Sequence, residues 1–194
     1  MDLFEGNALP GNFYRRPADL LAPLLLNKLL ATADGRVGRI VEVEAYAGDD
    51  PASHAFRGRT ARNAAMFGPA GHLYVYFTYG MHWCANAVCG QEGEGTAVLL
   101  RALEPLAGQE RMRQARPRAR SERDLCSGPA KLAQALGITG TLDGVDLASG
   151  AVRILGDGVP PPGDPVVTPR IGITKATELP WRWYVPGNPH VSRP

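Results

Sequence analysis

Residues 40–46 read Ile-Val-Glu-Val-Glu-Ala-Tyr, and residues 73–81 read Leu-Tyr-Val-Tyr-Phe-Thr-Tyr-Gly-Met. Side chains alternate between the two faces of a strand. The expected faces of a strand over 40–46 are Ile40, Glu42, Glu44 and Tyr46 on one side and Val41, Val43 and Ala45 on the other. The valine face can enter a core, so the opposite face holds a carboxylate beside a flat aromatic ring. That pairing suits a pocket that holds a planar ring and acts on it.

Short helices and further strands surround this stretch. Pro17 suits the first turn of a helix over 18–24, and Pro23 keeps that helix short. Asp34-Gly35 predicts a hairpin between residues 27–32 and 37–46. Other strands are expected at 73–79, 82–89, 96–103, 151–155, 170–174 and 182–185, and another helix at 129–136. We therefore predict an α+β fold, a single domain with a curved, largely antiparallel sheet flanked by short helices and long loops.

The chain has 194 residues, of which 44% are apolar, enough for one domain with a core. Residues 1–16 are expected to form an N-terminal arm to a domain that spans 17–194. Residues 47–72 are rich in Gly, Pro, Ser and Asn and predict a long loop that carries function. The tripeptide Glu104-Pro105-Leu106 is expected to end the strand at 96–103.

Positive charge is concentrated in two places although the net charge is only +2. Residues 111–123 hold six arginines and one glutamate, and Arg57, Arg59 and Arg62 follow the proposed strand. Such clusters on a nearly neutral chain favour an anionic partner. The arginine run also suits a solvated surface loop, and charge alone does not decide between the two.

Cysteine and histidine are sparse and form no metal-binding pattern. The three cysteines include no Cys-x-x-Cys, and the four histidines have no zinc-ligand spacing, so we expect no metal and a reducing compartment. The acidic N-terminus predicts no secretion signal, and no apolar run reaches the roughly 18 residues of a membrane span. A cytoplasmic location is expected, with association to the nucleoid if the chain is prokaryotic.

A set of short motifs runs in order from about residue 17 to residue 192. The motifs are Glu44-Ala45-Tyr46, Arg62-Asn63, Met66-Phe67, Leu73-Tyr-Val-Tyr76, Tyr79-Gly-Met81, Asn86, Leu99-Leu-Arg101-Ala-Leu-Glu-Pro105, Leu125-Cys-Ser-Gly-Pro129 with Lys131, and Tyr184-Val-x-Gly-x-Pro189-x-Val-Ser192. Together they resemble the alkyladenine DNA glycosylase family, the 3-methyladenine DNA glycosylases of the mammalian type. The resemblance covers nearly the whole chain.

The resemblance implies a monofunctional hydrolase of N-glycosyl bonds that works in base excision repair. Such an enzyme flips alkylated or deaminated purines out of double-stranded DNA, hydrolyses the N-glycosidic bond and leaves an abasic site. It implies that the enzyme uses neither a metal nor another cofactor. It also implies that the partner is duplex DNA containing damaged purines. A monomer with no membrane contact is the simplest expectation.

The resemblance implies that Glu44 is the general base. Hydrolysis of an N-glycosidic bond passes through a cationic sugar, and a carboxylate can both activate water and stabilise that charge. Arg101 matches a residue that helps to position the water. On residue type alone Glu44 could instead be an ion-pair partner, and Glu42 is a rival on the same expected face.

The resemblance also assigns the base pocket. Tyr46, His54 and Tyr76 match the walls around the flipped base, where stacking is worth about 1–3 kcal/mol per base. The match at His54 crosses a loop that is one residue shorter than in the mammalian form. Asn86 matches a residue at the pocket floor that opposes the exocyclic amine of guanine.

Tyr79 matches the residue that enters the duplex and fills the vacated stack, and Met81 in the same turn is expected to support it. Candidates for phosphate contact are Arg57, Arg59, Arg62, Ser127 and Lys131. The sequence shows no clear second carboxylate to protonate a neutral leaving base, so a site built on Glu44 alone favours cationic lesions.

Two other functions compete with the glycosylase. A binding module could clamp RNA or DNA through the arginine run and use the tyrosines as a stacking platform, without a need for Glu44. A nucleoside hydrolase could use Glu44 on free nucleosides, without a need for Tyr79 or the arginines. The ordered motif set favours the glycosylase over both.

Overall fold

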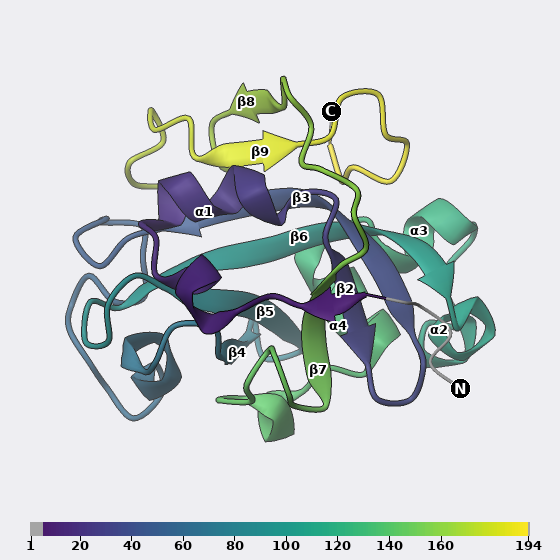
Figure 1. The fold of residues 1–194 in the computed structure, drawn as a ribbon, viewed down its shortest axis with the longest axis horizontal. Helices are drawn as coiled ribbons and strands as arrows, with labels where there is room; N and C mark the ends of the chain where they lie inside the picture. Colours follow the sequence, from purple (N-terminus) through teal and green to yellow (C-terminus); the bar gives the residue numbers. More distant parts are fainter. Residues whose placement is uncertain (1–5, 194) are drawn as a thin grey trace.

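The computed structural model describes residues 6–193, and its strands form one antiparallel sheet in the order β1-β7-β2-β3-β6-β5-β4, with β9 paired to β3 and β8 paired to β9 (Figure 1). The strands are β1 (Asn7–Ala8), β2 (Leu29–Thr32), β3 (Val37–Tyr46), β4 (Leu73–Thr78), β5 (His82–Cys89), β6 (Thr96–Ala107), β7 (Val152–Gly156), β8 (Val166–Thr168) and β9 (Arg182–Tyr184). The helices are α1 (Ala18–Leu25), α2 (Gln109–Ala115), α3 (Glu122–Cys126) and α4 (Pro129–Leu136), with short 3₁₀ turns at Gly11–Tyr14, Ala64–Phe67 and Gly140–Leu142. The expected α+β fold with an antiparallel sheet and short helices is confirmed.

The long strands β3 and β6 cross the middle of the molecule and carry the core (Figure 1). Helix α1 packs on both strands, and α4 packs on β5 and β6. Leu21 of α1 and Leu132 of α4 are fully buried in the same apolar cluster as Leu100 of β6. Both helices therefore bury one apolar face against the sheet, which is how a mixed fold of this size closes its core.

The N-terminal arm is tied to the sheet in its described part. Asn7–Ala8 pairs antiparallel with β7, and Tyr14 is fully buried in the main core cluster. Residues 1–5 of the expected arm lie outside the described residues.

A β-bulge interrupts the alternation that residues 40–46 predict. Ile40 pairs with Leu103 and Glu42 with Ala102, and the register shifts on both sides of Glu42. Ile40 consequently packs in the main core cluster with Val43 and Ala45, whereas Val41 packs in a separate cluster, so the expected placement of Ile40 and Val41 is wrong. An extra residue at a bulge turns the side chains before it to the other face.

The expected elements are confirmed wherever the local pattern is strong. The first helix, the hairpin over 27–46, the strands at 73–78 and 82–89, the helix at 129–136 and the strand at 182–184 are all present. The strand at 96–103 continues to Ala107, because Pro105 faces Gly38 where the register shifts, so it does not stop the strand.

Residues 170–174 form a loop, so the strand expected there is wrong. Gly172 has a φ of +78°, outside the range of a strand. The backbone N–H of Ile171 donates to a side chain, Glu44, in place of a neighbouring strand.

The arginine-rich run 111–123 is folded into α2, α3 and the turn between them. Arg111, Arg116 and Arg123 donate to backbone carbonyls, and Arg113 lies 3.7 Å from both Glu110 and Glu122. Part of this positive charge is therefore used within the protein. Within residues 6–193, no helix has the length and apolar character that a bilayer crossing would require.

Candidate active site

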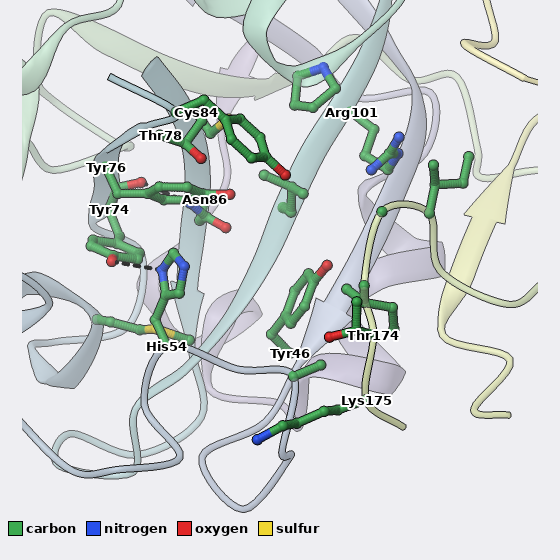
Figure 2. A pocket seen from close by; sticks show the side chains of 18 of the residues that line it. Tyr46, His54, Tyr74, Tyr76, Thr78, Cys84, Asn86, Arg101, Thr174 and Lys175 are labelled. Atoms are coloured by element: carbon green, nitrogen blue, oxygen red, sulfur yellow. Dashed lines mark hydrogen bonds between the residues drawn. The ribbon is translucent and has the colours of Figure 1, made fainter. Parts of the chain in front are cut away.

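A cavity of about 530 Å³ opens beside the end of β3, and strands β4, β5 and β6 contribute side chains to it. Figure 2 shows Tyr46 on one side of this cavity and Tyr74, Tyr76 and His54 on the other, with Asn86 between the walls. The loop residues 171–175 complete the lining. The aromatic residues Tyr46, His54 and Tyr76, which the sequence singled out, lie up to 30 positions apart in the chain and meet here.

Glu44 lies behind this lining with a fully buried carboxylate. Its Oε2 accepts a hydrogen bond from Tyr46 Oη at 2.9 Å and lies 3.1 Å from Arg101 Nη1. Its Oε1 accepts the backbone N–H of Ile171 at 2.7 Å. A carboxylate oxygen can accept two hydrogen bonds, so Oε1 retains capacity for one more donor, such as water.

Glu42 is also fully buried, but donors surround both of its oxygens. Arg101 Nε and Arg182 Nε each donate to Oε1 at 2.8 Å, and Ser192 donates through its backbone N–H and its hydroxyl. Burial alone would raise the pKa of Glu42, but Arg101, the Ser192 N–H and Arg182 hold it below the ordinary value. Glu42 is therefore an ion-pair partner, which leaves Glu44 as the carboxylate beside the cavity.

Arg101 joins the two carboxylates. Between the pairs Glu42–Ala102 and Val43–Leu100, Arg101 is the unpaired residue of β6 at the bulge. Burial tends to lower its pKa, but Glu44 and Glu42 raise it above the ordinary value, so the side chain stays charged. Arg101, an arginine whose side chain faces the interior, therefore has two anionic partners, Glu42 and Glu44.

The wall opposite Tyr46 is a packed aromatic group. The His54 and Tyr76 rings have centroids 4.4 Å apart and an interplanar angle of 85°, and His54 Nδ1 lies 3.1 Å from Tyr74 Oη. Burial and the nearby Arg62 lower the pKa of His54, so its imidazole is neutral near pH 7. Burial raises the pKa of Tyr74 to about 12 and raises those of Tyr46 and Tyr76 as well, so these rings stay neutral too.

Asn86 lines the cavity from β5, which lies in the sheet between the strands that carry Tyr46 and Tyr76. It lies on β5 and is almost fully buried. Its Nδ2 donates to the carbonyl of Tyr74 at 3.1 Å, which fixes the orientation of the amide. A fixed amide at this depth can discriminate among bases by the group that each presents to it.

Tyr79 projects from the turn between β4 and β5. Its side chain is 82% exposed and Met81 beside it is 67% exposed. Tyr79 and Gly80 have φ values of 51° and 65°, and Met81 N–H donates to Thr78 O at 3.2 Å, so the turn is tight and holds a tyrosine in an unusual conformation. Tyr79 also lines the rim of the cavity.

The candidate phosphate contacts lie in two groups. Arg62 donates to the carbonyl of Phe77 at 2.6 Å, beneath the Tyr79 turn, and Arg57 and Arg59 are exposed in the same loop. Lys131 forms an ion pair with Asp124 and lies 3.5 Å from Ser127 Oγ. The second group borders a shallower hollow of about 460 Å³ lined by Arg120, Ser121, Arg123, Asp124, Ser127, Lys131 and Ser192.

Residues 12–189 match the family model described as methylpurine-DNA glycosylase. The chain belongs to the methylpurine-DNA glycosylase family. A relative from Burkholderia lata is 64% identical over 194 residues, which cover 98% of this chain and 94% of the relative. Relatives from Methanoculleus marisnigri and Carboxydothermus hydrogenoformans are 50% and 49% identical, with 95% of this chain and 98% of each relative covered. All three bear the name "Putative 3-methyladenine DNA glycosylase".

This membership makes the protein a DNA repair glycosylase, an enzyme whose substrate is DNA. It decides against the two competing functions, a binding module without catalysis and a hydrolase of free nucleosides. The resemblance that the ordered motifs indicated is confirmed.

The motifs did not reveal several residues around the glycosylase cavity. Asp50 and Arg170 form a buried ion pair behind Tyr46, and Thr174 and Lys175 line the rim. A strand expected at 170–174 hid this loop, and Gly172, which favours a turn over a strand, was the available signal. In the described part of the chain, no group of three or more His, Cys, Asp or Glu side chains is arranged to hold a metal ion.

Proposed function

We propose that this glycosylase is monofunctional and releases alkylated or deaminated purines, 3-methyladenine among them, that it has flipped out of double-stranded DNA. The observation that carries the proposal is the position of Glu44, a buried carboxylate held by Tyr46, Arg101 and Ile171 directly behind an aromatic-walled cavity. A planar base between the walls brings its sugar toward this carboxylate.

Glu44 acts as the general base. Its Oε1 accepts a proton from a water that attacks the anomeric carbon, while the bond to the base breaks and its electron pair leaves with the base. The carboxylate also stabilises the cationic sugar that forms on the way. Arg101, Tyr46 and the Ile171 N–H hold the carboxylate in a fixed orientation for this step.

The walls select a purine. Tyr46 on one side and Tyr76 with His54 on the other provide flat faces for stacking, and an electron-poor alkylated base stacks on electron-rich rings as a cation does. The amide of Asn86 opposes bases that carry the exocyclic amine of guanine.

The chemistry of the leaving base determines which lesions are released fastest. A purine alkylated at a ring nitrogen is already positively charged and departs without help, whereas hypoxanthine needs a proton. No Asp or Glu occurs among the described residues that line the cavity, and the lowered pKa of His54 makes it a weak proton source near neutrality. We therefore expect cationic lesions to be released faster than neutral ones.

The exposed Tyr79, supported by Met81, enters the duplex and offsets the unstacking cost of the flipped base. Arg59, Arg62, Ser127 and Lys131 contact phosphates on either side of the cavity. These contacts supply affinity without sequence information. The enzyme acts as a monomer, with residues 17–194 as its glycosylase domain.

The experiment is base release from methylated duplex DNA by the wild-type enzyme, by Glu44→Gln and by a control, Glu104→Gln. Glu104 lies farther along β6 and accepts a bond from Asn188, outside the cavity lining. We expect the control to keep its activity and Glu44→Gln to lose base release by about 100-fold or more while it still binds DNA. Strand breaks that appear only after alkali treatment identify a monofunctional enzyme.

Three other outcomes have distinct meanings. Release by all three proteins would remove Glu44 as the base and keep the enzyme. No release by the wild type with DNA binding intact would exclude methylated purines as the substrate. Strand breaks without alkali would show that the enzyme cleaves the abasic strand itself.

A further inference from the structure

Two segments that lie 120 positions apart in the chain meet at the guanidinium of Arg170. Its Nη1 donates to the carbonyl of Ala45 at 2.9 Å, and the two nitrogens Nη1 and Nη2 contact the two carboxylate oxygens of Asp50. Nη2 also lies 3.5 Å from the carbonyl of Ala176. Both side chains of the Arg170–Asp50 pair are fully buried. The pair thus joins the end of β3, the loop that follows β3 and the loop that follows β8.

The same guanidinium supports the ring of Tyr46 from behind. Arg170 Cζ lies 4.6 Å from the Tyr46 ring centroid and 5.4 Å from that of Trp181. A cation over an aromatic face is attracted to it, so the ring is held against the guanidinium. Tyr46 lines the cavity and Arg170 does not, so the tyrosine lies between the arginine and the space where a base would stack.

The Arg170–Asp50 pair also holds in place the two loops that complete the cavity. Ile171, next to Arg170, donates its N–H to Glu44 at 2.7 Å and lines the cavity. Asp50 accepts the N–H of Ala52 at 2.9 Å, in the loop that carries His54. A shift of Arg170 would therefore move the donor to Glu44 and loosen the wall opposite Tyr76.

We propose that Arg170 is a positioning residue for base excision, and this inference rests on the proposed role of Glu44. Arg170 touches neither base nor water. It holds the Tyr46 side chain and the Ile171 backbone in place, so that the Tyr46 hydroxyl and the Ile171 N–H both donate to Glu44. Because misplacement by about 1 Å can cost about 100-fold in rate, this support acts on the chemical step itself. A pair that served stability alone would leave that step unchanged in the folded enzyme.

The test uses Arg170→Lys and Asp50→Asn in the full chain, with Arg39→Lys as the matched control. Lysine keeps the charge of Arg170 but lacks the planar two-pronged donor that Asp50 and Ala45 require. Arg39 on the same strand β3 pairs with Asp157 at 2.7 Å and lies outside the cavity lining. Each protein is assayed by single-turnover release of 3-methyladenine from a duplex at saturating enzyme, by affinity for undamaged duplex, and by thermal melting, with assays run below each melting temperature.

We expect Arg170→Lys and Asp50→Asn to lower the single-turnover rate constant by about tenfold or more, and the affinity for undamaged duplex to change by less than about twofold. The control should keep both values. Unchanged rate constants in folded variants would overturn the proposal, since the pair would then serve stability only. Failure of both variants to fold would overturn it as well. Failure of the proposed function looks different, because the wild type itself would then release nothing or Glu44→Gln would remain active.

Discussion

Arg101 Nη1 lies 3.1 Å from Glu44 Oε2, and the Nε of the same guanidinium lies 2.8 Å from Glu42. One buried cation thereby links a carboxylate that also accepts hydrogen bonds from Arg182 and Ser192 to one that lies directly behind the cavity lining. Because the linker is an arginine, both contacts are made by a rigid planar group, and movement of either glutamate is transmitted to the other. We consequently expect the contacts of Glu42 with Arg101, Arg182 and Ser192 to affect the position of the Glu44 carboxylate.

The first prediction concerns Glu42→Gln. The variant removes the carboxylate that pairs with the buried Arg182 and leaves Arg101 with Glu44 alone, and loss of one partner of a buried pair costs about 3–5 kcal/mol of the free energy of unfolding. Urea unfolding at pH 7 measures this loss. Glu104→Gln, which affects a partly exposed carboxylate on the same sheet, should cost far less. A Glu42→Gln protein as stable as the wild type would show that the arginines find other partners.

The second prediction is the pH dependence of the same contribution. The folded-state pKa of Glu42 lies below its ordinary value of 4.5, so its ion pairs contribute fully above that pH and are lost as pH falls through the folded value. The difference in unfolding free energy between wild type and Glu42→Gln should therefore be largest at neutral pH and shrink below pH 4.5. Urea titrations across this range check it, and a difference that stays constant would contradict it.

The third prediction concerns the proposed wedge. Tyr79→Ala should weaken binding to a lesion-containing duplex by about 1–3 kcal/mol, the range for loss of one aromatic stacking contact. The single-turnover rate at saturating enzyme should fall less, because Tyr79 does not touch Glu44. Leu20→Ala, which removes another exposed apolar side chain on α1, serves as the control and should change neither value. If Tyr79→Ala changes neither the binding nor the rate, the wedge proposal is wrong.

The fourth prediction concerns His54. Burial and then Arg62 lower the pKa of this imidazole. Arg62→Met removes a nearby positive charge, so the pKa of His54 should rise toward its ordinary value of 6.5. An NMR titration of the His54 ring protons reads this shift directly. If catalysis requires a neutral His54 in the wall, the pH below which the single-turnover rate falls should be higher in the same variant.

The fifth prediction concerns phosphate contacts. The logarithm of the DNA association constant should fall linearly with the logarithm of salt concentration, with a slope of about 0.9 for each phosphate neutralised. Lys131→Met should reduce that slope by about one. Lys28→Met, which removes a lysine that donates to the Val159 carbonyl away from the cavity, should leave the slope unchanged. Equal slopes for the three proteins would exclude Lys131 as a phosphate contact.

Local patterns predicted much of the sheet. The strand over His82–Cys89 and the helix over Pro129–Leu136 have the expected bounds, because their apolar spacing, turn residues and first-turn proline act within a few positions. The strand expected at 170–174 fails for the opposite reason. Its two isoleucines, Ile171 and Ile173, are half-buried and line the cavity, and the backbone N–H of Ile171 donates to Glu44, 127 positions earlier in the chain.

The sequence by itself determined the class of fold, the family and the aromatic residues that line the cavity, since each is encoded in short motifs and in the alternation of strands. Only the tertiary structure distinguished the surroundings of Glu42 from those of Glu44. The bulge that leaves Arg101 unpaired on β6 points it at both carboxylates, and donors from Arg182 and Ser192 complete the shell of Glu42. The Arg170–Asp50 pair likewise depends on contacts across 120 positions. A periodic pattern specifies which face a side chain takes, whereas the partners it meets there are set by packing among distant segments.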